Sequence, residues 1–422
     1  MKIKKLLDRN QNLFIAWCLV ASFGTYFCMY AFRKPFNAGL YSGLFLGGLG
    51  YKSVLIISQV LGYTFSKFFG IKVISELKAG ARVRLILMLI FFAEGTLFLF
   101  GLVPHPYNFV FLFLNGLPLG MVYGVVFSFL EGRRFTEMIA MGISISVIAA
   151  SGILKTTYFE VREILPSVTE FWMPFTIGLI FLPLFLLFVW MLSVIPAPTK
   201  EDQRLRSERK PMSANDKREA LREFGFPIFC FVAVYTLLTM CRDFRDNFTV
   251  EIWNEIDAHW TSSRLARTEL ISGFMILIFI GGASLFKSNV KGFRYISGII
   301  ILGLLISGTV TLLFKAGIMD GYYWMLWIGI GMFLSYISIQ TTVFERMIAL
   351  YKIKANAGFF VYICDSIGYL ASVGLLLYKE FFMSNNKWSD VLIRLNLLVA
   401  VSGILLMAAA GYFFWKHKAR SK

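Results

Sequence analysis

The sequence predicts an all-α integral membrane protein of about twelve transmembrane helices, arranged as two pseudo-symmetric bundles of six. The composition is the first reason: 57% of the 422 residues are hydrophobic and only 16% are charged, with a mean hydropathy of +0.68. Soluble domains are charged at about one residue in four, so this balance excludes a soluble enzyme. The second reason is that the apolar residues gather in long runs, and the third is that basic residues mark the ends of those runs.

Each predicted span is a run of about 20 mostly apolar residues, which is the length that a helix needs to cross a bilayer core. The runs are continuous and do not alternate, which excludes the strands of a membrane β-barrel. The first run follows a basic N-terminus, but it is too long for a signal peptide and no cleavage site follows it, so we expect it to be retained. The predicted spans are residues 13–32, 53–69, 85–103, 109–130, 138–157, 171–195, 226–245, 270–286, 295–314, 322–344, 357–378 and 391–415.

The positions of the basic residues predict the orientation of the spans. Lys and Arg favour cytoplasmic loops, and this bias explains a formal net charge of +17 without a nucleic-acid partner. Residues 103–108 and 251–260, which fall on the opposite side, contain neither Lys nor Arg. We therefore expect both termini in the cytoplasm, with the protein in the cytoplasmic (inner) membrane of a bacterium. The predicted cytoplasmic groups lie at residues 2–9, 72–84, 133–134, 200–222, 287–294, 346–354 and 416–422.

A basic polar stretch between spans six and seven divides the chain. Its prolines stop helices, and its charges keep it in water or against anionic headgroups. We expect a solvated connector and not a nucleic-acid-binding arm. The predicted domains are an N-terminal six-helix bundle at 1–195, a cytoplasmic linker at 196–224 and a C-terminal six-helix bundle at 225–422.

Similar features recur at corresponding positions of the two halves. Span four reads Leu-Gly-Met-Val-Tyr at 119–123, and span ten reads Ile-Gly-Met-Phe-Leu at 330–334. Each span ends with a glutamate followed closely by arginine, which we interpret as a structural clamp at a cytoplasmic helix end. Two repeated halves are typical of transporters that bind a substrate near the bilayer midplane. The four clamp residues are Glu131, Arg133, Glu345 and Arg346.

Two arginines at the far ends of corresponding spans are the main functional signal. Arg33 follows span one and Arg242 lies in span seven, where a charge is unfavourable unless it faces a cavity or a partner. Two guanidinium forks at similar depth can grip a phosphate or carboxylate. Three other interpretations stay open. They are that Arg33 extends to the outer interface, that Arg242 pairs with Asp243 or Asp246, or that Arg245 faces the cavity in place of Arg242.

Two acidic residues within the predicted spans are candidates for coupling. A carboxylate at membrane depth binds a proton more readily than one in water, so Asp365 and Glu94 are candidates to carry a proton during transport. The alternative for each is a satisfied hydrogen bond between helices, which fits Glu94 better. Further polar and aromatic residues are predicted to line the substrate site, although an aromatic packing stripe explains the two tyrosines equally well. They are Tyr26, Tyr30, Lys34, Lys155 and Gln340.

The chain resembles the major facilitator superfamily of transporters in its number of spans, its central linker and its half-repeat. Two motifs are similar to those of the organophosphate:phosphate antiporters, namely Tyr-Ala-Phe-Arg-Lys-Pro-Phe at 30–36 and Gly-Tyr-Thr-Phe-Ser-Lys-Phe at 62–68. The resemblance implies that Arg33 and a span-seven arginine, Arg242 or Arg245, hold a substrate phosphate, with Lys67 as the matching span-two lysine. The loop-two motif of the superfamily is only partly kept at 75–84, and spans four to six contain no histidine.

The predicted function is secondary active transport of a small anionic solute, phosphorylated or carboxylated, by alternating access. The alternative is a transporter-like receptor that binds a solute without moving it. An enzyme is not predicted, because no nucleophile motif, metal set or Walker-type loop is present. The five cysteines lie in apolar runs and the three histidines are scattered, so neither disulfides nor a metal are expected. The expected partners are the solute, the bilayer and a co-transported proton or exchanged anion, with no cofactor and a monomeric protein.

Overall fold

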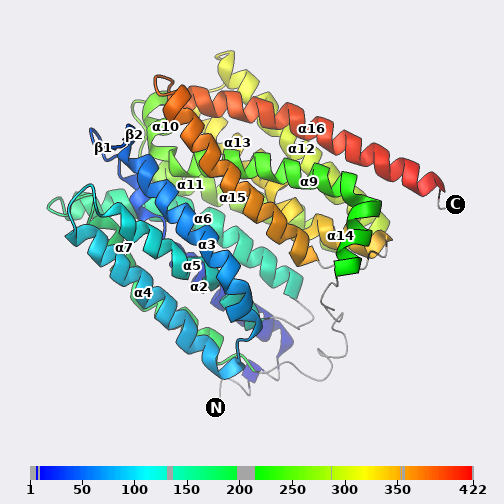
Figure 1. The fold of residues 1–422 in the computed structure, drawn as a ribbon, viewed down its shortest axis with the longest axis horizontal. Coiled ribbons are helices and arrows are strands. Elements are labelled where there is room, and N and C mark those ends of the chain that lie inside the picture. The colour runs from blue at the N-terminus through cyan, green and yellow to red at the C-terminus, as the bar shows by residue number, and fades with distance from the viewer. Residues whose placement is uncertain are drawn as a thin grey trace. The chain divides into compact units, whose positions relative to one another are not determined.

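The computed structural model describes residues 6–7, 10–130, 136–196, 214–286, 288–351, 353 and 357–420. In this part of the chain the regular elements are helices, apart from a hairpin of β1 (Phe45–Leu46) and β2 (Leu49–Gly50) (Figure 1). Gly47 and Gly48 join the two strands with φ values of 60° and 81°, a left-handed conformation that favours glycine. Ten helices among the described residues are long and apolar enough to cross a membrane. The predicted all-α membrane fold is confirmed.

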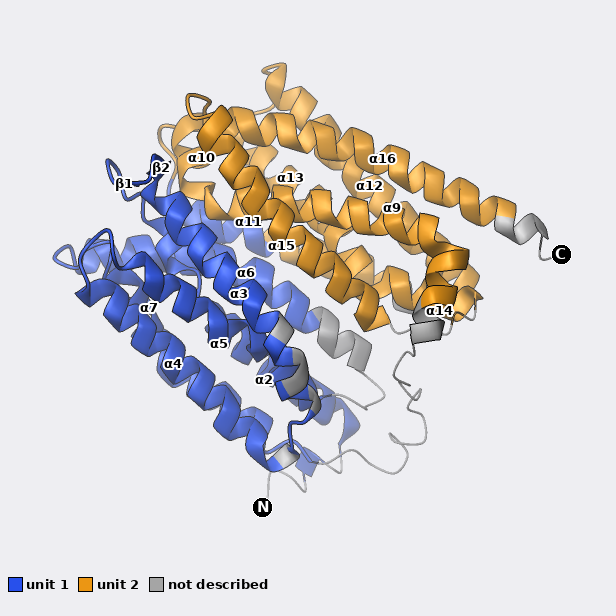
Figure 2. Ribbon diagram, viewed as in Figure 1, with its two compact units in different colours: residues 1–207, 261–270 blue, residues 208–260, 271–422 orange. Residues whose placement is uncertain are grey.

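The chain forms two compact units, which Figure 2 colours separately. Unit 1 comprises residues 1–207 and 261–270, and unit 2 comprises residues 208–260 and 271–422. The helices of unit 1 are α2 (Gln11–Ala31), η1 (Pro35–Ala38), α3 (Tyr51–Ser75), η2 (Ala79–Ala81), α4 (Arg82–Leu102), α5 (Phe109–Ser128), α6 (Thr136–Ile164), α7 (Met173–Ser193) and the first residues of α11 (Ser263–Gly281).

Unit 2 holds the rest of α11 and the later helices. A π-helical segment, η4, interrupts the tenth span between α13 and α14. The further elements of unit 2 are α9 (Ala214–Asn247), α10 (Thr249–Ile256), η3 (Gly282–Leu285), α12 (Asn289–Lys315), α13 (Gly321–Ser338), η4 (Ile339–Val343), α14 (Phe344–Tyr351), α15 (Ala357–Phe382) and α16 (Trp388–Arg420).

Each of the twelve predicted spans overlaps a long helix, but several boundaries differ. The helix α9 begins at Ala214, inside the segment predicted as linker, because residues 214–223 are mostly good helix formers such as Ala, Lys, Arg, Glu and Leu. The segment predicted as a loop after span seven contains the short helix α10. Its apolar residues Val250, Ile252 and Trp253 are buried, and Glu255 accepts hydrogen bonds from the backbone N–H groups of Trp388 and Ser389 at the start of α16.

Glycines bring α3 and α5 of unit 1 into close contact. A Cβ atom at Gly62 would lie 2.0 Å from the carbonyl oxygen of Phe113, and one at Gly116 would lie 2.3 Å from the carbonyl oxygen of Gln59. Small residues let two membrane helices approach until their backbones touch. This packing fixes α3 against α5, and with it the side chains that α3 contributes to the candidate site.

The helices of unit 2 are held by glycine contacts and by polar side chains. A Cβ atom at Gly331 of α13 would lie 2.5 Å from the carbonyl oxygen of Gly303 in α12. The amide of Asn396 in α16 donates to the carbonyl oxygen of Ser307 at 2.9 Å and to the hydroxyl of Thr311 at 2.7 Å. A buried amide that bonds a neighbouring helix fixes the pairing of the two helices, because an unsatisfied amide in hydrocarbon is unfavourable.

Candidate functional site

Arg33 is held at the end of α2 by contacts of its backbone. Its N–H donates to the carbonyl oxygen of Tyr30 at 3.0 Å, so the chain turns directly after the helix. Its carbonyl oxygen accepts from Nε2 of Gln59 in α3 at 2.8 Å. The same Nε2 also donates to Asn115 of α5 at 2.8 Å, and Asn115 donates to the carbonyl oxygen of Phe32 at 3.1 Å. Three helices therefore fix the position of this arginine.

The side chain of Arg33 and that of Lys67 both approach the ring of Tyr63. Arg33 is 5% exposed, and its guanidinium carbon lies 3.8 Å from the centroid of the Tyr63 ring and 5.6 Å from that of Tyr30. Nζ of Lys67 lies 5.4 Å from the Tyr63 centroid. Both contacts are cation–π interactions. The structure therefore places the span-one arginine and the span-two lysine on one aromatic ring.

The predicted tyrosines continue from this pair as a row of aromatic rings. Tyr26 contacts Tyr30 edge-on, with ring centroids 5.6 Å apart, and it contacts Tyr123 of α5 in the same way at 5.6 Å. Tyr26 and Tyr30 are buried, and Lys34 is partly buried in the turn after Arg33. The tyrosines thus pack as an aromatic stripe, and one end of that stripe lies against the Arg33 guanidinium.

Lys155 contributes another buried cation to unit 1. It lies in α6, is 2% exposed, and its Nζ donates to the hydroxyl of Ser151 one turn earlier at 3.1 Å. A cation in the interior of a membrane helix usually faces a cavity or a polar partner.

Glu94 packs against the helix α7 rather than against a basic residue. It is 5% exposed, and neither of its carboxylate oxygens makes a hydrogen bond with any residue that the structure describes. A Cβ atom at Gly178 of α7 would lie 2.2 Å from Oε2 of Glu94, so the carboxyl group occupies the space that this glycine leaves open. The satisfied interhelical hydrogen bond that we expected for Glu94 is not seen with the described residues.

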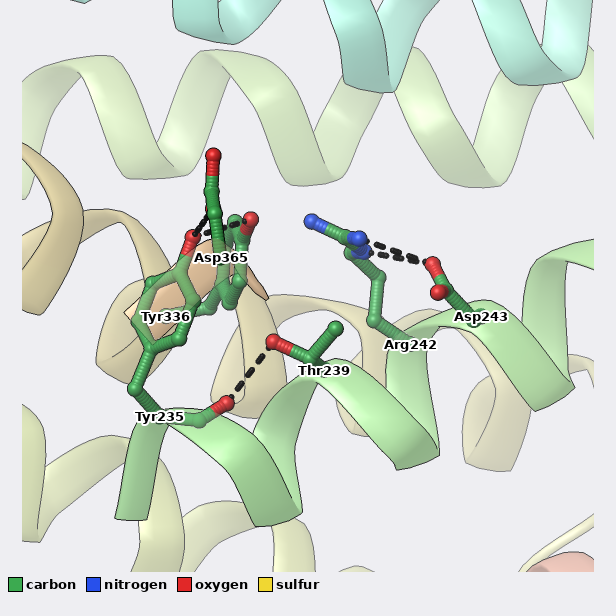
Figure 3. A network of polar contacts seen from close by, with 6 residues as sticks. All are labelled: Tyr235, Thr239, Arg242, Asp243, Tyr336 and Asp365. Atoms are coloured by element: carbon green, nitrogen blue, oxygen red, sulfur yellow. Dashed lines mark hydrogen bonds and ion pairs between the residues drawn. The ribbon is translucent and has the colours of Figure 1, made fainter. Parts of the chain in front are cut away.

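In unit 2, Arg242 forms an ion pair with its neighbour Asp243 (Figure 3). Nε and Nη2 of Arg242 donate to Oδ1 of Asp243 at 3.0 Å and 2.8 Å, and both side chains are 11% exposed. The guanidinium carbon also lies 4.4 Å from the centroid of the Tyr336 ring. The internal ion pair, one of the interpretations that the sequence left open, is therefore present with Asp243.

Arg245 has a different environment from Arg242. It is 2% exposed, and its Nη2 donates to the carbonyl oxygen of Met325 in α13 at 3.0 Å. A Cβ atom at Gly329 would lie 3.0 Å from the same nitrogen. Arg245 thus ties α9 to α13, while Arg242 lies beside the polar side chains drawn in Figure 3.

Two tyrosines and Asp365 form a hydrogen-bonded network beside Arg242. The hydroxyl of Tyr235 in α9 donates to Oδ1 of Asp365 in α15 at 2.5 Å, and its oxygen lies 2.6 Å from the hydroxyl oxygen of Tyr336 in α13. The two rings stack with centroids 4.7 Å apart. Figure 3 shows this network on the side of Arg242 away from Asp243. Three helices of unit 2 meet at these side chains.

Three further predicted residues lie in η4 and α14. Gln340 is partly buried in η4, and π-helical segments occur frequently at functional sites. Arg346 donates to the carbonyl oxygens of Ala283 and Phe286 and to Asn289 at 3.2–3.4 Å, so it joins α14 to the start of α12. Glu345 is partly buried beside it. The other two predicted clamp residues, Glu131 and Arg133, lie outside the described residues.

Sequence reasoning missed the tyrosines that organise both clusters. Tyr63 precedes Lys67 by four positions, and Tyr235 precedes Arg242 by seven, so each pair lies on one face of its helix. That spacing was the available signal, but it is hard to recognise in a sequence in which 17% of all residues are aromatic. The sequence held no such spacing signal for Tyr336, because Tyr336 lies in α13 whereas Arg242 lies in α9.

Residues 35–417 match a family described as "Family of unknown function (DUF5690)". The chain belongs to this family. No match was found among curated proteins.

Several solved structures resemble this member of the DUF5690 family over almost their whole length. The nucleoside transporter NupG is 15% identical with a TM-score of 0.60, covering 94% of this chain and 98% of its own. The peptide transporter POT in complex with alafosfalin is 12% identical with a TM-score of 0.64, and the match covers 94% of this chain and 94% of that chain. The D-xylose-proton symporter is 13% identical with a TM-score of 0.55, and the match covers 92% of this chain and 96% of that chain. The DUF5690 chain therefore has the major facilitator fold, as its sequence indicated, while the organophosphate subgroup stays a prediction.

Proposed function

We propose that this DUF5690 protein is a secondary transporter that moves a small organic anion, phosphorylated or carboxylated, by alternating access. The fold supports transport, since the similar structures include transporters for nucleosides, for peptides and for D-xylose with protons by their own titles. The anionic character of the solute rests on the side chains of this chain. At 12–15% identity, the similar structures do not specify a substrate.

The observation that carries the anion proposal is the convergence of Arg33 and Lys67 on Tyr63. Charges at membrane depth usually face a cavity or a partner. A phosphate or carboxylate bound beside Arg33 and Lys67 would be attracted by both cations, and Arg33 would bind it through a planar fork of N–H donors. Lys155 adds to the positive charge of unit 1.

Arg242 has a secondary role in this proposal. Its ion pair with Asp243 neutralises most of its charge, so unit 2 does not duplicate the basic cluster of unit 1. Nη1 of Arg242 makes no hydrogen bond with the described residues, and the guanidinium extends toward the Tyr336 side in Figure 3. In this proposal the basic cluster of unit 1, and not Arg242, makes the main charge interaction with the solute.

We also propose the membrane arrangement that the basic loops predict. Both termini face the cytoplasm, the protein lies in the inner membrane of a bacterium, and it works as a monomer. The bias of Lys and Arg toward alternate loops supports the orientation. A reporter that fluoresces only in the cytoplasm, fused after residue 422, should fluoresce, and the same reporter inserted at residues 104–107 should not.

The function can be tested by counterflow in proteoliposomes. Vesicles loaded with inorganic phosphate, phosphorylated sugars or dicarboxylates should exchange the matching labelled compound, while vesicles loaded with uncharged sugars or nucleosides should not. Arg33→Ala should abolish exchange and Arg33→Lys should weaken it, because Lys lacks the bidentate fork. Arg84→Ala, at an exposed position at the start of α4, is the matched control and should exchange normally.

Two outcomes would contradict this proposal. Preferential exchange of uncharged solutes would exclude an anion carrier. Saturable binding of the anions to purified protein without any exchange would favour the receptor that the sequence left as the alternative.

A further inference from the structure

The end of α2 leaves two backbone carbonyl groups that need hydrogen-bond donors. The helix ends at Ala31, and Pro35, four residues later, has no N–H that could bond the Ala31 carbonyl oxygen and extend the helix. The carbonyl oxygens of Phe32 and Arg33 therefore lie beyond the regular helical bonds. Both residues are buried, with 0% and 5% of their surface exposed. A buried carbonyl oxygen without a donor is unfavourable, so these two oxygens need donors from elsewhere in the chain.

Two side-chain amides supply these donors. Nδ2 of Asn115 in α5 donates to the carbonyl oxygen of Phe32 at 3.1 Å, and Nε2 of Gln59 in α3 donates to that of Arg33 at 2.8 Å. The amides are also bonded to each other, and Asn115 donates in addition to the carbonyl oxygen of Ala93 in α4 at 3.1 Å. Gln59 is 2% exposed and Asn115 is 0% exposed. A buried set of hydrogen bonds thus connects α4, α5 and α3 to the residue that carries the guanidinium.

One face of α3 holds Arg33 at both its backbone and its side chain. Gln59, Tyr63 and Lys67 follow each other at intervals of four residues, so they lie on the same face of the helix. Gln59 bonds the Arg33 backbone, and the Tyr63 ring lies 3.8 Å from the Arg33 guanidinium carbon. Nζ of Lys67 approaches the same ring to 5.4 Å. The place of the Arg33 guanidinium relative to Lys67 therefore depends on how firmly α3 holds the end of α2.

We propose that Gln59 and Asn115 are positioning residues for anion binding, which act through the backbone of Arg33 and without touching the solute. This inference rests on the proposed function and assigns a part in it to two neutral residues. A guanidinium fork binds a phosphate or carboxylate through two parallel N–H···O bonds, so its orientation matters as much as its charge. Small errors in the placement of such a group strongly weaken its interaction with the bound molecule.

A second buried asparagine of unit 1 offers a matched comparison. Asn108, directly before α5, is 1% exposed, and its Nδ2 donates to the carbonyl oxygen of Phe100 in α4 at 3.1 Å. Its Oδ1 accepts from the hydroxyl of Tyr51 in α3. Asn108 therefore joins the same three helices as Asn115, with the same kind of bond to α4, but its hydrogen bonds with the described residues do not involve the end of α2. Buried amides of this kind hold membrane helices together, and Asn108 represents that role alone.

The first test compares the affinity for anions among three variants. The probes are inorganic phosphate, glycerol phosphate and succinate, and the measurement is the concentration dependence of counterflow in proteoliposomes. Gln59→Met and Asn115→Leu remove each amide at nearly constant volume. Each should raise the KM of the exchanged anion at least about tenfold, while the maximal rate stays near that of wild type because the loss is one of binding. Asn108→Leu should leave the KM near that of wild type.

Melting temperatures separate positioning from stability. Asn108→Leu and Asn115→Leu should lower the melting temperature of the purified protein by similar amounts, because each removes a buried amide that joins α3, α4 and α5. Only Asn115→Leu should also raise the KM. An equal rise of the KM in both variants would overturn the proposal, since it would mean that the amides act on transport through helix packing in general.

The second test asks whether the effect passes through the guanidinium. Lys presents a point charge without a fork, so its interaction with an anion depends less on orientation. Gln59→Met should therefore raise the KM much less in an Arg33→Lys background than in the wild-type background. The four proteins form a double-mutant cycle. The same fold increase in both backgrounds would overturn the positioning role.

A milder variant covers the case in which Gln59→Met does not fold. Gln59→Asn retains an amide that is one methylene group shorter, so its bond to the Arg33 carbonyl oxygen must lengthen. Its KM should lie between those of wild type and Asn115→Leu, and a KM equal to wild type would overturn the role of Gln59. Wild-type protein that exchanges none of the three anions would instead overturn the proposed function, on which this inference rests.

Discussion

The guanidinium carbon of Arg33 lies 3.8 Å from the centroid of the Tyr63 ring, which joins the end of α2 to α3 through a cation–π contact. The ring holds the guanidinium without neutralising it, because an aromatic face offers attraction but no opposite formal charge. A carboxylate in the same place would bind the arginine and also cancel its charge. Unit 2 shows this second arrangement at Arg242 and Asp243.

The Tyr63 ring should therefore contribute to transport through its π face. Tyr63→Leu should raise the KM for the exchanged anion by roughly 2- to 30-fold, which corresponds to the loss of about 0.5–2 kcal/mol of cation–π attraction. Tyr63→Phe keeps the ring and should stay close to wild type. The measurement is the concentration dependence of counterflow. Equal defects in both variants would mean that the hydroxyl group matters instead.

Asp243→Asn should lower the melting temperature of the purified protein and make it sensitive to anions. The substitution removes the ion-pair partner of Arg242, and breaking one side of a largely buried ion pair is strongly destabilising. Inorganic phosphate should restore part of the lost stability, since it can replace the missing carboxylate. Melting curves in phosphate and in chloride at equal ionic strength check this. Identical losses in both salts would contradict an accessible Arg242.

The contact between α3 and α5 should not tolerate a methyl group at Gly116. A Cβ atom there would lie 2.3 Å from the carbonyl oxygen of Gln59, whose side chain holds the Arg33 backbone. Gly116→Ala should destabilise the fold by about 1–3 kcal/mol or more, as overpacked cores do. The control is Gly95→Ala in α4, where no atom lies within 4 Å of the added Cβ. Thermal melting should separate the two variants, and equal curves would argue against this close approach.

Gly178→Ala should be destabilising because the added methyl group meets Glu94. The new methyl group would lie 2.2 Å from Oε2 of Glu94, so the carboxyl group must move. Glu94→Ala removes the obstacle, and the double variant should be more stable than the sum of the two single effects predicts. A double-mutant cycle of melting measurements gives this interaction energy. Additive effects would show that the two positions do not touch.

Arg245→Ala should lower stability without changing which solutes are exchanged. Arg245 is buried and bonded to the carbonyl oxygen of Met325, so its loss removes a hydrogen bond between α9 and α13 and leaves a cavity there. Solute selectivity in counterflow should match wild type at a temperature where the variant stays folded. An altered order of preferred anions would instead place Arg245 at the substrate site.

The sequence determined the membrane character and the helical pattern of this protein. A run of about 20 apolar residues has few stable conformations in lipid other than a helix, because every backbone N–H and C=O must be bonded within the segment. For the same reason each predicted span overlaps a helix of the structure. The motifs around Arg33 and Lys67 predicted that these two residues belong to one site, which stays a prediction; the ring of Tyr63, which both side chains approach, was not predicted.

Only the tertiary structure decided which partner each intramembrane charge has. In the sequence, Arg242 was the leading candidate and Arg245 the alternative, yet Arg242 pairs with Asp243 beside two tyrosines and Arg245 bonds the backbone of α13. The link between Tyr235, Tyr336 and Asp365 joins three helices that are far apart along the chain. Helical periodicity specifies the face on which a side chain lies, but the neighbour on that face depends on how helices pack.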